Sequence, residues 1–491
     1  ALAAGACSDD GAAETAATST TILRPSTVLR VGAEDWPRCL NPLTCVDDVL
    51  REQVLQHVLP VAFEIDANGD YAASPLLVSE PEPTVTDQGI EIRYELSTAA
   101  RWADGRPITS SDFFGTWQAI MNTPGADQRR YERIVSVDDA DPAIAVITLD
   151  GPMIDWQELF GGATGFLFEA DAFGASTDLT GQFEDELPFG AGPYVLSSWD
   201  DNGAVLSATE PWEGTDAARI DQVRLDRVEI DGLGDPMTFD VLLPADRSEV
   251  DGPDGFETRS TPSTSVLGVW FDQREPALQP LEERRALQLL LDRTVLTAQA
   301  GLGAVVDCAG WVPDLGPWCD AASIEPIAAD RDAGSAALAA LGWEPTPDGV
   351  LVRDGQVLFV PVTYDPAIPG AQAAATSVNE TLSEAGVWSG VVELSVEEWS
   401  NSERPLATSS GIGVLPVDLG TSPRVDDLYG CGGGPVSSVV ASCETQIVDA
   451  ARRLSGASGQ DALDAVMSLA ELVQDQVLWL PIGQYDERSF V

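Results

Sequence analysis

Residues 90–121 restrict the possible fold of this chain more than any other segment. Apolar and charged residues alternate at its start, with Ile92, Tyr94 and Leu96 set between Glu91, Arg93 and Glu95, which predicts a strand with one buried face. An Asp-Gly pair and a proline in residues 101–107 predict a turn. The Thr-Ser-Ser-Asp run at residues 109–112 is typical of a capping box and predicts a helix. Its buried face would carry Phe113, Trp117, Ile120 and Met121.

Other segments continue the alternation of strands and helices. Strands are predicted at residues 27–32, 265–271 and 477–482, and helices at residues 46–58, 281–296 and 461–475. The helix at 281–296 should bury Leu287, Leu290, Leu291 and Val295, and the last helix Leu463, Val466, Met467, Ala470 and Val473. The fold class is therefore α/β or α+β with mixed sheets.

Length and charge narrow the class of protein and its partners. A chain of 491 residues is too long for one ordinary core, so two or three packed units are expected. Eighty acidic residues face 26 basic ones, none of them lysine, and the net charge of −54 argues against nucleic acid as a partner. Such acidity fits a surface adapted for solubility, and a preference for cationic ligands stays open. No apolar run is long enough to predict a membrane span.

Six of the seven cysteines fall into three close pairs, each around a short loop rich in Gly, Pro or Asp. Local pairing is the simplest of the fifteen possible connectivities: Cys39 with Cys45, Cys308 with Cys319, and Cys431 with Cys443. Each bridge would add about 2–3 kcal/mol of stability. Metal binding is the alternative, but a single histidine and no C-x-x-C motif argue against it, so we expect neither metal nor cofactor. The pairs indicate an oxidising compartment.

The seventh cysteine, Cys7, follows a run of small apolar residues at positions 1–6. This run reads as the end of a signal segment and resembles the lipobox of bacterial lipoproteins, in which Cys7 would carry the lipid. A free thiol in a frayed terminus is the other interpretation. Residues 8–21 contain no large apolar residue and should form a solvated tether.

Residues 94–113, called the signature segment below, carry the clearest resemblance to a known family. They include Tyr-Glu-Leu and then Arg-Trp-Ala-Asp-Gly-Arg-Pro-Ile-Thr-Ser-Ser-Asp-Phe. This order resembles the family 5 extracellular solute-binding proteins, the peptide- and nickel-binding class that serves ABC transporters. Four weaker matches accompany it: Leu-Asn-Pro-Leu at 40–43, Gly-Ala-Gly-Pro-Tyr at 190–194, Arg-Arg-Ala-Leu at 284–287 with Asp-Arg at 292–293, and Leu-Gly-Trp at 341–343 with Asp-Gly-Val at 348–350.

The resemblance implies a two-lobed periplasmic-binding-protein-like fold, type II cluster C, with an inserted subdomain. Residues 1–25 would be a signal remnant, lipobox and tether. Lobe one would comprise residues 26–45, 185–260 and 476–491, the inserted subdomain residues 46–184, and lobe two residues 261–475. The chain would cross between the lobes near Thr261 and near Trp479, which predicts a hinge that closes over a ligand.

The resemblance also suggests where a ligand would bind. Asp418 corresponds to the aspartate that pairs with a peptide amine in relatives, although an acidic residue in a loop is also an ordinary solvated group. Gly268 could let a ligand backbone approach closely, or it could mark a bulge. Trp270 and Trp399 are candidate lining residues, with a core role as the alternative for Trp270. Asn41, in the Leu-Asn-Pro turn, completes the predicted set.

No catalytic motif supports an enzyme. The sequence lacks G-x-S-x-G, a phosphate-binding P-loop and any lysine for a Schiff base, and His57 lies in a helical pattern better suited to a core or boundary position than to nickel. A carboxylate pair for glycoside hydrolysis stays open, because acidic residues are abundant. We therefore predict no catalytic residues.

The sequence thus predicts a monomeric solute-binding lipoprotein on the outer face of the cytoplasmic membrane. It would capture a small ligand, an oligopeptide first of all, for the permease subunits of an ABC importer, and would touch the membrane through its lipid anchor alone. The alternative is an envelope lipoprotein of the same fold that regulates or scaffolds cell-wall glycolipid assembly.

Overall fold

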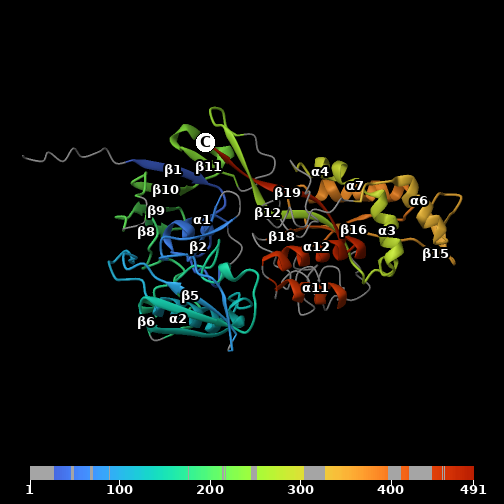
Figure 1. Ribbon diagram of the computed structural model, residues 1–491. Helices are drawn as coiled ribbons and strands as arrows, with labels where there is room; N and C mark the ends of the chain where they lie inside the picture. The colour runs from blue at the N-terminus through green and yellow to red at the C-terminus, as the bar shows by residue number, and fades with distance from the viewer. Residues whose placement is uncertain are drawn as a thin grey trace, which may run out of the picture.

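A ten-stranded mixed sheet runs through the whole molecule (Figure 1). The computed structural model describes residues 27–45, 49–66, 70–87, 89–174, 176–212, 215, 217–244, 252–302, 327–395, 411–419, 445–455, 457 and 459–491. The strand order in the sheet is β17 (Val391–Glu393), β16 (Val362–Tyr364), β18 (Ile412–Asp418), β12 (Thr258–Phe271), β19 (Trp479–Phe490), β11 (Val241–Leu243), β1 (Val28–Ala33), β10 (Gln222–Arg227), β9 (Gly203–Ala208) and β8 (Tyr194–Asp200).

Smaller sheets and eight described α-helices surround this sheet. A four-stranded sheet has the order β4 (Thr84–Thr86), β5 (Gly89–Glu95), β7 (Ile144–Leu149) and β6 (Ile134–Asp141). A two-stranded sheet pairs β2 (Phe63–Ile65) with β3 (Tyr71–Ala73). A three-stranded sheet has the order β13 (Glu344–Pro345), β14 (Leu351–Arg353) and β15 (Gln356–Val357). The helices are α1 (Val49–Val58), α2 (Ser110–Asn122), α3 (Leu281–Leu290), α4 (Arg293–Gln299), α6 (Arg331–Ala340), α7 (Ala371–Glu384), α11 (Thr445–Ser455) and α12 (Gly459–Gln476). None of the described helices is long and apolar enough to span a bilayer.

The hydrophobic core is divided between two lobes. One large cluster joins β1, β9, β10 and α1 to α2, β5 and β7, and a small one surrounds Phe490; we call these residues lobe one. Two further clusters lie on opposite faces of β12 and form lobe two. Leu267, Val269 and Phe271 face α3, α4 and α7, whereas Val266 and Trp270 face α11 and α12. The part of β12 that lies in lobe two is therefore buried on both of its faces.

The strands β12 and β19, called the crossing strands below, connect the lobes (Figure 1). They pair antiparallel along most of their length, from Thr258 with Phe490 to Trp270 with Trp479. Lobe two holds the start of β19: the buried guanidinium of Arg284 donates to the carbonyl oxygens of Gln476 and Val477, and Arg293 Nε donates to Pro481 O at 2.7 Å. In lobe one, Phe490 is fully buried and pairs with Leu242.

Two sequence predictions about helices are wrong in instructive ways. The helix expected at residues 281–296 is two helices, because the carboxylate of Asp292 accepts from the amides of Thr294 and Val295 and so caps a new helix, α4. The new register leaves Val295 44% exposed. In α12, Met467 is 43% exposed, and Ala462 and Leu469 are buried instead. Trp479, near which the sequence predicts a crossing between lobes, packs in a cluster of lobe two.

The signature segment folds as predicted, and its polar residues are structural. It places Asp112 in a capping box at the start of α2, where its carboxylate accepts from the amide of Thr109 at 2.8 Å. The same carboxylate accepts from the amide of Ala170 at 3.0 Å and from Trp102 Nε1 at 3.4 Å. Burial raises the pKa of Asp112 even though these hydrogen bonds oppose the shift. Asp112 therefore ties a turn, a helix and a distant loop together.

Candidate ligand-binding site

The crossing strands change register between the two lobes. Pro262 pairs with Asp486 and Val266 pairs with Gln484, so residues 263–265 form a bulge. The side chain of Gln484, only 5% exposed, donates from Nε2 to the carbonyl oxygen of Ser263. A bulge interrupts the ladder and bends the strand, so the paired strands between the lobes are interrupted at this point.

The end of β18 reaches the same bulge. Ser265 of β12 pairs with Asp418, and the amide of Leu419 donates to the carbonyl oxygen of Thr264 at 3.0 Å. The backbone of Asp418 therefore lies at the boundary between the lobes. The structure does not describe its side chain, so contact between its carboxylate and a ligand stays a prediction.

The structure places Gly268 and Trp270 inside lobe two. The indoles of Trp270 and Trp479 stack with ring centroids 4.3 Å apart and planes 7° from parallel. Trp270 is 2% exposed, and its Nε1 donates to the carbonyl oxygen of Leu415 at 2.9 Å. A Cβ on Gly268 would overlap the ring of Trp479, so this glycine makes room for the stack. Protein covers both residues, which favours the core alternative for Trp270, and the ladder shifts register between Leu267 and Gly268, as the bulge alternative for Gly268 predicted. Contact of either residue with a ligand stays a prediction.

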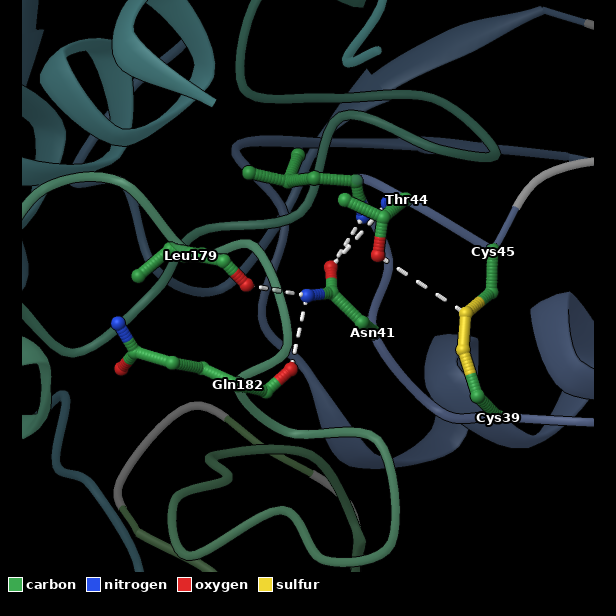
Figure 2. Close-up of a disulfide and its surroundings, with 7 residues drawn as sticks. Cys39, Asn41, Thr44, Cys45, Leu179 and Gln182 are labelled. Carbon is green, nitrogen blue, oxygen red and sulfur yellow. Dashed lines mark hydrogen bonds between the residues drawn. A yellow bond between two sulfur atoms is a disulfide. The ribbon is translucent and has the colours of Figure 1, made fainter. Parts of the chain in front are cut away.

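Asn41 is also structural (Figure 2). Its fully buried amide donates to the carbonyl oxygens of Leu179 and Gln182, both at 2.8 Å, and accepts from the amide of Leu43 at 2.8 Å. These bonds join the Leu-Asn-Pro turn to a distant loop, so the amide is not free for a ligand. Beside it, Cys39 and Cys45 form a disulfide with their Cα atoms 6.1 Å apart, which is the predicted pairing.

The remaining predicted positions lie outside the described residues. They are Cys7, Trp399 and the two pairs Cys308 with Cys319 and Cys431 with Cys443, and they stay predictions. Sequence reasoning missed the bulge at residues 263–265. Its signal was present, because residues 260–265 read Ser-Thr-Pro-Ser-Thr-Ser, and a proline among small polar residues inside a strand indicates an interrupted ladder.

The described residues show no arrangement of side chains that could hold a metal ion, because they include no group of three or more His, Cys, Asp or Glu residues placed to do so. His57, on α1, sits edge-on to Tyr194 with ring centroids 6.2 Å apart, and partial burial lowers its pKa. The residues of the bulge expose backbone and the small hydroxyl side chains of Ser263, Thr264 and Ser265.

The sequence resembles known binding proteins over most of its length. Residues 72–413, more than half of the 491, match the model "Bacterial extracellular solute-binding proteins, family 5 Middle". Protein XP55 of Streptomyces lividans is 26% identical over 332 residues, 62% of this chain and 58% of that protein. The oligopeptide-binding protein OppA of Mycobacterium tuberculosis is 28% identical over 260 residues, 48% of this chain and 42% of OppA.

A third relative matches over a shorter stretch. The probable monoacyl phosphatidylinositol tetramannoside-binding protein LpqW of Mycobacterium tuberculosis is 30% identical over 136 residues, 26% of this chain and 21% of LpqW. The chain thus aligns with about half the length of XP55 and of OppA, and with a smaller part of LpqW.

Solved structures share the fold at low identity. The periplasmic EDTA-binding protein EppA has a TM-score of 0.77 at 16% identity, covering 95% of this chain and 92% of EppA. The oligopeptide-binding protein AppA of Bacillus subtilis, solved with a nonapeptide, has a TM-score of 0.70 at 15% identity and covers 95% of both chains. The fold is therefore the mixed α/β, two-lobed periplasmic-binding-protein fold of cluster C that the sequence predicted.

Proposed function

Because this chain belongs to the family 5 bacterial extracellular solute-binding proteins, a family of binding proteins and not of enzymes, we propose that it captures an oligopeptide between its lobes for an ABC importer. The observation that carries the proposal is the division of the core into two lobes joined by a bulged pair of strands. Such a connection allows rigid-body closure with little cost in packing. A ligand enclosed by closure shifts the equilibrium only if the closed state binds it more tightly.

A peptide fits this arrangement for chemical reasons. An extended peptide can be held through its main chain by strand ends, and the end of β18 meets the bulge at Asp418. Its amine needs a carboxylate, for which Asp418 is our candidate. The names of OppA and of the AppA–nonapeptide complex support the peptide class. Attachment through Cys7, delivery to permease subunits, a monomeric state and the two further disulfides belong to the same proposal.

A thermal-unfolding screen tests this proposal directly. The full chain is melted with pools of three- to nine-residue peptides, with nickel–histidine, and with mannosylated phosphoinositides. A peptide present at 100 times its Kd should raise the free energy of unfolding by about 2.7 kcal/mol. Asp418→Asn should weaken binding of a peptide with a free amine at least tenfold, about 1.4 kcal/mol, and should leave binding of its N-acetylated form unchanged.

The screen also distinguishes the second candidate, recognition of a glycolipid headgroup in envelope assembly, which is favoured by the local similarity to LpqW. A rise in melting temperature with the mannosylated lipid and none with any peptide would replace the peptide proposal. Equal loss of both peptide forms in Asp418→Asn would exclude the pairing of Asp418 with the peptide amine while leaving peptide capture in place.

A further inference from the structure

One side chain of lobe one packs against the core of lobe two. Ile154, in the loop between β7 and the 3-10 helix Trp156–Glu158, contacts the apolar cluster enclosed by β18, β12, α11 and α12. Among the described residues that build or border the two clusters of lobe two, and apart from the crossing strands, it is the one residue that comes from lobe one. Within the described part of the chain, Ile154 is therefore the apolar contact between the two cores away from the crossing strands.

The loop that carries Ile154 is clamped on both sides by one short element. From the turn at residues 130–133, Arg133 Nε binds the carboxylate of Asp150 at 2.6 Å, and its Nη2 donates to the carbonyl oxygen of Pro152 at 3.0 Å. From the same turn, Arg130 Nε binds the carboxylate of Asp155 at 2.6 Å. The loop is thus anchored at Asp150 and Pro152, before Ile154, and at Asp155, directly after it.

Further contacts fix this clamp to the core of lobe one. The second guanidinium nitrogen of Arg130 lies 2.6 Å from a carboxylate oxygen of Glu158, whose other oxygen accepts from the hydroxyl of Tyr71 at 2.7 Å. The ion-paired side chains of Arg130, Asp155 and Glu158 are 12–16% exposed, so solvent screens these pairs less than surface pairs. Met153 is 7% exposed. Ile154 is thus presented by a rigid support, so little conformational entropy is lost when it packs on lobe two.

The surface that receives Ile154 is continuous with the candidate ligand site. Its cluster includes Leu415, Val417 and Leu419, which belong to β18 and the residue after it, and Asp418 lies between the last two. Contact with Ile154 therefore joins lobe one to the cluster that includes this strand end.

We propose that Ile154 is a latch: its contact with the α11–α12–β18 cluster holds the two lobes in the closed arrangement and so sets how tightly an enclosed solute is retained. This inference rests on the proposed function for its consequence, but the contact acts on the lobes whether or not a ligand is present. Loss of the side chain removes apolar burial from the closed state alone. The open-to-closed ratio should rise roughly tenfold, which corresponds to about 1.4 kcal/mol.

Small-angle X-ray scattering of the full chain without added ligand tests the latch. Ile154→Ala should increase the radius of gyration relative to the natural chain, and Ile154→Val should do so by less. The matched control is Ile65→Ala, which truncates a partly buried isoleucine of lobe one at β2 that borders no cluster of lobe two. It should leave the radius of gyration unchanged.

Arg133→Met provides an independent variant that leaves Ile154 in place. It frees the loop on one side, and it should give a smaller increase in the same direction. Identical scattering from the natural chain, Ile154→Ala and Arg133→Met, with all three folded by circular dichroism, would overturn the latch. That result would leave solute binding intact, whereas failure of the ligand screen would leave the scattering result intact.

Discussion

The signature segment and the crossing strands differ in how they are held together. The signature segment depends on particular side chains: the Asp112 carboxylate collects the amides of Thr109 and Ala170 and the indole N–H of Trp102. The crossing strands combine backbone pairing along most of their length with side-chain contacts between distant residues, such as the stack of Trp270 on Trp479. The region with the strongest sequence pattern is therefore structural, and the region that connects the two lobes has a weaker pattern. A specific motif in this chain indicates which fold forms.

Among the substitutions that test this difference, Asp112→Ala should have the largest effect on stability. Removal of the carboxylate leaves two amides and an indole N–H without their acceptor in a buried setting, at about 1–3 kcal/mol for each unsatisfied group. We expect the free energy of unfolding measured in urea to fall by about 3 kcal/mol or more. Ser111→Ala, one residue earlier and exposed, should change it by less than about 0.5 kcal/mol.

Solute affinity of folded Asp112→Ala should equal that of the natural chain, because Asp112 is buried in lobe one and bonds only to groups of that lobe. A loss of solute affinity without a loss of stability would instead place the signature segment in the ligand-binding site. The difference drawn above between the signature segment and the crossing strands would then not hold.

A smaller effect is expected from Gly268→Ala in the crossing strands. The new methyl group overlaps the Trp479 ring, and overpacking of this kind costs about 1–3 kcal/mol. Because the ring must shift, the near-ultraviolet circular dichroism of the Trp270–Trp479 stack should also change. Gly390→Ala, where a Cβ meets no atom within 4 Å, is the matched control and should alter neither signal. An unchanged spectrum in Gly268→Ala would show that the stack is not tight.

The smallest effect on stability should come from Gln484→Ala. It removes one hydrogen bond across the bulge, to Ser263, worth about 1 kcal/mol. Amide exchange of residues 265–267 should nevertheless accelerate, because the bulge loses its side-chain support. The exposed Gln372→Ala in α7 should leave that exchange unchanged. Protection that stays constant in Gln484→Ala would mean that backbone pairing alone fixes the angle between the lobes.

Sequence reasoning succeeded where the causes are local. The alternation in β5 and the capping box of α2 each depend on residues a few positions apart, and both appear in the structure. The break between α3 and α4 was local as well: the capping preference of Asp292 was present in the sequence, but the apolar spacing around it favoured one helix. The Cys39–Cys45 disulfide was predictable for the same reason of proximity.

Reasoning from the sequence could not identify contacts whose partner lies far along the chain. Trp270 is core because Trp479 stacks on it, and Asn41 is structural because the loop at residues 179–182 supplies two carbonyl oxygens. Neither partner can be inferred from residues near position 270 or 41. The Ile154 contact has the same origin, since nothing near residue 154 indicates a neighbour in α11 and α12.

The pairing of β12 with β19 also constrains how the molecule assembles. Thr258 meets Phe490 and Trp270 meets Trp479, so each rung of the ladder joins positions more than two hundred residues apart. Bringing such distant segments together carries a loop-closure cost that local helices and hairpins do not have. The same ladder supplies the core of lobe two with Trp270 and Trp479, so neither that core nor the connection between the lobes can form from neighbouring residues alone.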